Sequence, residues 1–130
     1  MLFISPFYAS LLVALIVFLA YRVTTFRRGE GISLGDESGS KAMKSAVRAH
    51  ANAVENIPAG IVLLVILELN HLMPWLIHVF GITLLASRIA HAYGLSKKNG
   101  PSKGRFYGTL FTWLCLLSMV LVNLLILVTR

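Results

Sequence analysis

Polar side chains recur along one segment of a chain that is otherwise strongly apolar. Arg48, Asn52 and Glu55 follow one another at spacings of four and three residues, which places them on one face of a helix. Arginine offers a planar fork to a carboxylate, an asparagine amide both donates and accepts, and a glutamate can hold an ammonium group. This order suits a zwitterion with its carboxylates near the surface and its amine further in. The alternative, equally open for this segment alone, is that these groups pair with other helices and fix their register.

Three further side chains lie at a similar predicted depth. Arg88 and His91 are three residues apart on another helix and so lie on neighbouring faces, where Arg88 is placed to pair with Glu55 or with a helix-end carbonyl. Arg105 opens a later apolar segment, where it either serves the same site or anchors its helix at the membrane surface. His50 and His91 come with no cysteine or carboxylate at metal-ligand spacing, so no metal site is predicted.

These side chains must be positioned by helices that cross a membrane. Of the 130 residues, 57% are hydrophobic and 13% are charged, whereas soluble domains carry about 25% charged residues. Crossing the hydrocarbon core takes about 20 mostly apolar residues, and four stretches of the chain meet that requirement. The sequence therefore predicts an all-α fold, an integral membrane four-helix bundle with one domain over residues 1–130. The predicted helices cover about residues 5–23, 41–69, 74–94 and 105–129.

The ends of these segments carry local signals. Ser40 is of a residue type that caps a helix N-terminus, and Pro74 suits the first turn of the third helix. No basic residue precedes Arg22, so the first segment lacks the positive region of a cleavable signal peptide. We therefore expect the first segment to be a retained helix.

Positive charge is concentrated in two connections, and this predicts the orientation. The net charge is +7, and lysine and arginine gather in and beside residues 24–40 and 94–104, while the turn at 70–74 has none. The positive-inside rule places the two basic connections in the cytoplasm and both termini outside. Because topology accounts for the basic residues, no nucleic-acid partner is predicted, and the lipid membrane is the expected environment.

Two strings of residues resemble those of a known family. The segment RAHANAVENIP at residues 48–58 closely resembles the second-helix signature of the membrane-associated proteins in eicosanoid and glutathione metabolism (MAPEG), which reads R-A-[HQ]-x-N-x-x-E-x-x-P. The segment SRIAH at 87–91 resembles the third-helix pattern R-x-x-H of the same family. The similarity covers nearly the whole chain and is greatest to the short bacterial, microsomal glutathione transferase-like members, which implies the bacterial inner membrane.

The resemblance implies a homotrimer that binds glutathione, as co-substrate, between neighbouring subunits near the cytoplasmic face. Arg22 looks like the arginine of the first helix that meets a glutathione carboxylate, with Arg27 or Arg28 as alternatives in a shifted register. His50 matches a position that reaches glutathione from the adjacent subunit. The complete set of glutathione contacts that the resemblance implies is Arg22, Arg48, His50, Asn52, Glu55 and His91.

The implied reaction begins with deprotonation of the glutathione thiol. Arg105 looks like the arginine at the start of the fourth helix that stabilises the thiolate, since a nearby cation lowers the pKa of a thiol. The thiolate then attacks an apolar electrophile from the bilayer, in conjugation or in peroxide reduction. Several family members have a tyrosine four residues after the third-helix histidine and a serine after the fourth-helix arginine; this chain has Leu95 and Phe106 there.

Two other functions compete with the transferase. A small four-helix multidrug-type transporter would use a membrane carboxylate as a proton-coupled cation site, and here that carboxylate would be Glu55. Such transporters keep their glutamate in the first helix, which has none in this chain. A catalytically silent protein that binds glutathione is the other alternative, and Leu95 and Phe106 keep it open.

Overall fold

The computed structural model describes residues 2–97 and 102–129. It contains four helices, and each is long and apolar enough to cross a membrane. The expected all-α four-helix membrane bundle is therefore confirmed, although residues 98–101 of the predicted connection 94–104 lie outside the described part. The helices are α1 (Ile4–Glu30), α2 (Lys41–Leu69), α3 (Pro74–Lys97) and α4 (Lys103–Val128).

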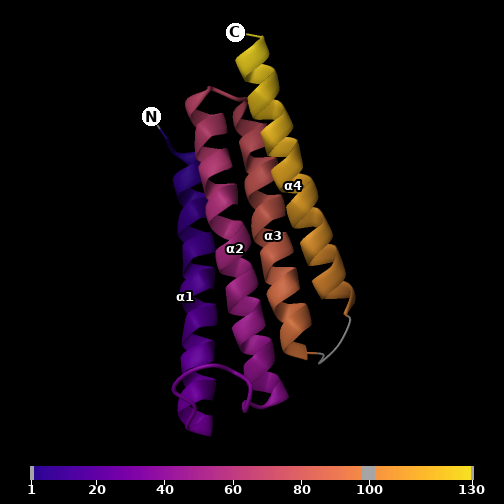
Figure 1. Cartoon of the computed structure of the whole chain (residues 1–130). Coiled ribbons are helices and arrows are strands. Elements are labelled where there is room, and N and C mark those ends of the chain that lie inside the picture. The colour runs from indigo at the N-terminus through magenta and orange to yellow at the C-terminus, as the bar shows by residue number, and fades with distance from the viewer. Residues whose placement is uncertain (1, 98–101, 130) are drawn as a thin grey trace.

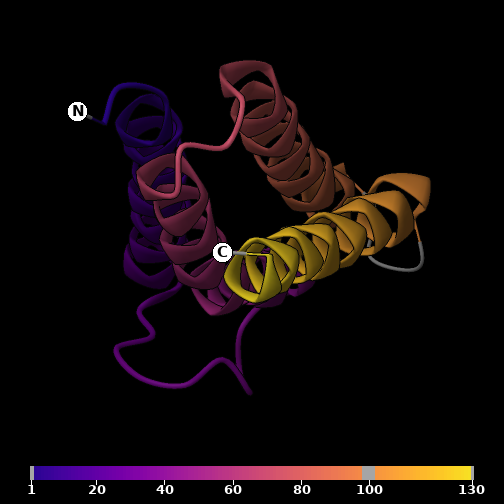
Figure 2. The same ribbon diagram turned by 90° about the horizontal axis from the view of Figure 1, so that it is seen from above.

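The helices run alternately up and down (Figure 1). One end of the bundle holds the α1–α2 connection, the C-terminal end of α3 and the N-terminal end of α4. The other end holds both chain termini and the α2–α3 turn. The two basic connections thus share one side, as the predicted topology requires. Viewed from above (Figure 2), α2 stands between its neighbours, and it packs against α1, α3 and α4.

A stripe of small and aliphatic residues buries one face of α2. Its members recur every three or four positions, the period of a helix face. The small ones let neighbouring helices approach closely: a Cβ added at Gly60 would lie 2.4 Å from Cδ2 of Leu84. The polar face predicted from the sequence, which carries Arg48, Asn52 and Glu55, lies on a different side of α2 from this stripe. The buried residues of α2 are Met43, Ala46, Ala49, Ala53, Ile57, Gly60, Leu64 and Leu67.

The first helix extends further than the apolar pattern predicted. It continues past residue 23 to Glu30, where Gly31 ends it in the left-handed conformation with φ +66°. Arg27 and Arg28 lie in the last turn, where cations favourably face the helix C-terminus. The prediction was too short because it used apolarity as its criterion, and the last two turns of α1 are polar.

Ser40 joins the end of α1 to the start of α2. Its Oγ accepts a hydrogen bond from the Met43 amide at 3.1 Å, which confirms the predicted cap. Its own amide donates to Oε2 of Glu30 at 2.8 Å. The connection between the two helices is therefore anchored at both ends by one serine.

The opposite end of α1 is capped by a side chain from α2. Oε1 of Glu68 accepts from the amides of Phe3 and Ile4, both at 2.8 Å, and Oε2 accepts from the amide of Ser5 at 2.7 Å. The first amides of a helix have no partner within the helix, and at a membrane they cannot be left unsatisfied without a cost of several kcal/mol. A carboxylate on a second helix supplies the missing acceptors.

We predict that Glu68→Gln destabilises the protein by about 1–3 kcal/mol, because a carboxamide presents one acceptor oxygen where three amides need acceptors. Thermal unfolding of detergent-purified protein, followed by circular dichroism, measures the effect. Glu37→Gln is the matched control, since Glu37 lies exposed in the α1–α2 connection. Equal melting temperatures for the two variants would contradict the capping role.

Candidate functional site

The polar face of α2 divides into two parts in the structure. Arg48 and Glu55 are exposed on the outside of the bundle, whereas Asn52 and Asn56 are half-buried. Within the described residues, neither Arg48 nor Glu55 has a hydrogen-bond or ion-pair partner. The two charged side chains therefore point away from the other helices of the chain, while Asn52 points toward α3.

A buried arginine of α3 receives Asn52. The side chain of Arg88 is only 3% exposed, and each of its three nitrogens donates a hydrogen bond to a different residue. Nε donates to Oγ1 of Thr112 at 2.8 Å, Nη2 donates to the carbonyl oxygen of Gly108 at 3.0 Å, and Nη1 donates to Oδ1 of Asn52. Arg88 thus ties α2, α3 and α4 together and does not pair with Glu55.

This contact decides which way the Asn52 amide faces. Arginine has only donors, so the atom that meets Arg88 must be the amide oxygen. The Asn52 nitrogen is then the group left for a ligand, and it can only donate. Asn52 is consequently suited to a carboxylate or carbonyl oxygen. In the sequence, Arg88 stands out as a cation deep within an apolar helix, but it was not among the predicted glutathione contacts.

His91 lies where α3 and α4 approach each other closely. It is 4% exposed, and a Cβ added at Gly108 would lie 2.7 Å from the Cβ of His91. Within one subunit His91 is therefore packed between helices rather than open to a ligand.

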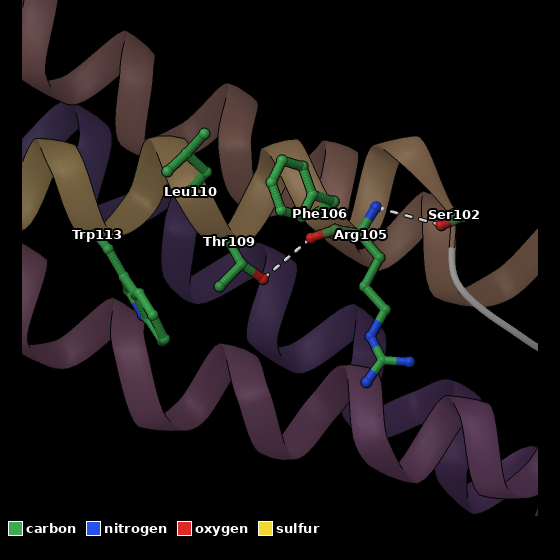
Figure 3. A pocket seen from close by; sticks show the side chains of 6 residues that line it. All are labelled: Ser102, Arg105, Phe106, Thr109, Leu110 and Trp113. Carbon is green, nitrogen blue, oxygen red and sulfur yellow. Dashed lines mark hydrogen bonds between the residues drawn. The ribbon is translucent and has the colours of Figure 1, made fainter.

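Arg105 lines a cavity with a volume of about 540 Å³. It lies in the first turn of α4, where its amide donates to the capping Oγ of Ser102 at 3.2 Å. Figure 3 shows Arg105, Thr109 and Trp113 directed to the same side of α4, with the guanidinium extending toward the side on which α2 runs. A permanent cation here adjoins an aromatic wall, so the cavity offers surface both to an anion and to an apolar molecule. Its lining residues are Ser102, Arg105, Phe106, Thr109, Leu110 and Trp113.

Arg22 lies in a different groove, between α1 and α3. Its Nη1 donates to Oγ of Ser96, and its guanidinium carbon is 6.0 Å from the ring centre of Phe26. The groove has a volume of about 280 Å³. In the described part of the chain, α1 and α4 do not pack against each other. The fold of this chain therefore does not place Arg22 beside Arg105. His50 is half-buried on α2 and lies about 160–200° around that helix from Arg48 and Asn52.

The two positions that depart from the family pattern lack a hydroxyl near the cavity. Leu95 is 7% exposed and belongs to the apolar core, while Phe106 lines the cavity beside Arg105. The Thr109 hydroxyl already donates to the carbonyl oxygen of Arg105 at 3.0 Å. Arg105 is thus the cation that the cavity presents. Among residues 2–97 and 102–129, no group of three or more His, Cys, Asp or Glu side chains is placed to hold a metal.

Sequence comparison shows the family to which the chain belongs. Residues 5–125 match the sequence model of the MAPEG family. The chain belongs to the MAPEG family. This MAPEG protein is 39% identical over 121 residues to the inner membrane protein YecN of Escherichia coli strain K12, across 93% of this chain and 90% of that protein. The protein of the same name from Escherichia coli O6:H1 gives the same values. The family predicted from residues 48–58 and 87–91 is confirmed.

We predict that Thr112→Val destabilises this MAPEG protein by about 1–3 kcal/mol, because it removes an acceptor from a buried cation while keeping the side-chain shape. Thr109→Val is the matched control one turn away, since the Thr109 hydroxyl contacts only the carbonyl of its own helix. Thermal unfolding in detergent compares the two. A loss in Thr109→Val as large as that in Thr112→Val would argue against the Arg88 network.

Proposed function

We propose that this MAPEG protein is a glutathione transferase of the inner membrane, which binds glutathione between the subunits of a homotrimer. The observation that carries the proposal is the exposure of Arg48 and Glu55 on the outer face of α2. Glu55 lies about 10 Å along the helix from Arg48, toward the membrane interior. An ionised carboxylate at that depth is costly against lipid and requires a partner.

A neighbouring subunit and a zwitterionic ligand together meet that requirement. Arg48 and the Asn52 amide nitrogen suit the carboxylates of glutathione, and Glu55 suits its ammonium group. Since Arg22 cannot reach the Arg105 cavity within one subunit, we assign Arg22 and His50 to the site of the adjacent subunit. His91 is buried where α3 packs against Gly108 of α4, so we assign it a positioning role beside the site rather than a direct contact with glutathione.

Arg105 is the residue that activates the thiol. A fixed cation favours the thiolate over the thiol, and an arginine at a partly dehydrated site acts strongly because screening there is weak. The thiolate sulfur attacks an electrophilic carbon, forming a sulfur–carbon bond, and the leaving group departs with its electron pair. The apolar electrophile reaches the sulfur from the bilayer along the wall formed by Phe106, Leu110 and Trp113.

The location in the inner membrane rests on the name of the YecN relative together with the four apolar helices. The orientation rests on the positive-inside rule. The α1–α2 and α3–α4 connections are cytoplasmic, so Arg48 and Arg105 lie near the compartment that holds glutathione.

We predict that Glu55→Gln weakens glutathione binding at least about tenfold, because it removes the partner of the ligand ammonium. Calorimetry with the purified protein measures this, with Glu37→Gln as the control.

In Arg105→Ala we expect the glutathione thiolate absorbance and the conjugation of a chlorinated nitrobenzene to be lost. Thiolate formation that persists in Arg105→Ala would contradict the proposed mechanism, and tight binding without turnover by the wild type would identify a catalytically silent protein.

Subunit mixing tests the shared site. Arg22→Ala and Arg105→Ala should each be inactive as homotrimers. Co-expressed in equal amounts, they should regain about a quarter of the wild-type activity, because one interface in four then joins an intact Arg22 to an intact Arg105 from its neighbour. If both arginines served a site within a single subunit, no mixture would restore activity.

A further inference from the structure

We propose that a cavity at the end of α1 binds a phosphate group, supplied by the head group of an anionic phospholipid. The cavity has a volume of about 320 Å³. The last turns of α1 form one wall, and the connection that folds back along them forms the other (Figure 1). Thr24 and Arg28 lie about 160° and 120° around the helix from Arg22, so this cavity is separate from the α1–α3 groove. Its lining residues are Thr24, Arg27, Arg28, Gly31, Ile32 and Ser33.

The cavity offers donors that lack an acceptor. Nη1 of Arg27 is shielded from solvent and has no hydrogen-bond partner among the described residues. A buried donor of a charged group without an acceptor is costly, so this position calls for an anion. Arg28 and the Ser33 hydroxyl provide further donors, whereas the Thr24 hydroxyl is already used on the carbonyl oxygen of Ala20 at 3.1 Å. Planar guanidinium forks match the oxygen geometry of a phosphate.

The depth of the cavity favours a membrane lipid as the source of the phosphate. The apolar stretch of α1 ends near Arg22, and Arg28 lies about 9 Å further along the helix. The head-group layer on each side of a bilayer is about 5–8 Å thick, so Arg27, about 7.5 Å from Arg22, lies within it and Arg28 lies at its outer edge. Leu34, directly after Ser33, is 90% exposed. An aliphatic side chain beside cations suits a molecule with both a phosphate and an apolar part.

Lipid titration of the delipidated full-length protein in neutral detergent tests this site. Native mass spectrometry follows binding of phosphatidylglycerol, with phosphatidylcholine as the uncharged comparison. We expect the double variant Arg27→Gln/Arg28→Gln to bind phosphatidylglycerol at least about tenfold more weakly than the wild type. The charge-matched control Lys41→Gln/Lys44→Gln removes two exposed cations from the start of α2 and should retain binding to within about threefold. Equal losses in the two double variants would overturn the proposal.

Two further measurements complete the test. Hydrogen exchange of the wild type should show protection over residues 24–34 when phosphatidylglycerol is added, and this needs no variant to fold; no protection there would overturn the proposal. Glycerol phosphate is the soluble competitor. If glycerol phosphate displaces the lipid and its binding depends on the arginine pair, the cavity is a phosphate site whose phosphate comes from a soluble molecule. If it does not compete, the phospholipid is the source.

Discussion

The buried guanidinium of Arg88 determines how three of the four helices meet. Each of its nitrogens has its own partner, Asn52 on α2 and Thr112 and Gly108 on α4. A buried cation is tolerated only where its donors are satisfied, so the three helices can have one relative position. Gly108 contributes twice, because its carbonyl accepts from Arg88 and its lack of a side chain admits His91.

The same interaction separates the polar face of α2 into an inward and an outward part. Asn52 is drawn toward Arg88 and keeps only its amide nitrogen for a ligand, while Arg48 and Glu55 stay on the outside of the bundle. These two exposed charges on a membrane helix have no partner among the described residues, and the proposed shared site rests on this observation. The Arg105 cavity is lined by residues of α4 and its N-cap, whereas the Arg22 groove lies between α1 and α3.

Much of the architecture followed from local sequence. The number of helices depends on apolar length, and Ser40 and Pro74 mark helix starts through contacts with their own neighbours in the chain. The placement of Arg48, Asn52 and Glu55 on one face also follows from the period of the helix alone. The family could be predicted from residues 48–58 because that segment holds the signature without interruption. The end of α1 was missed because its last two turns are helical without being apolar.

The tertiary structure alone decided which of the aligned polar groups is buried and which is open. The sequence left Glu55 or a helix-end carbonyl as the partner of Arg88. The way in which α2, α3 and α4 pack places Asn52, Thr112 and Gly108 at its guanidinium instead. The capping of α1 by Glu68 joins residues more than sixty positions apart, so no local pattern announces it. The physical reason is common to these cases: hydrogen bonds between helices depend on packing distance and rotation, which short segments of sequence do not encode.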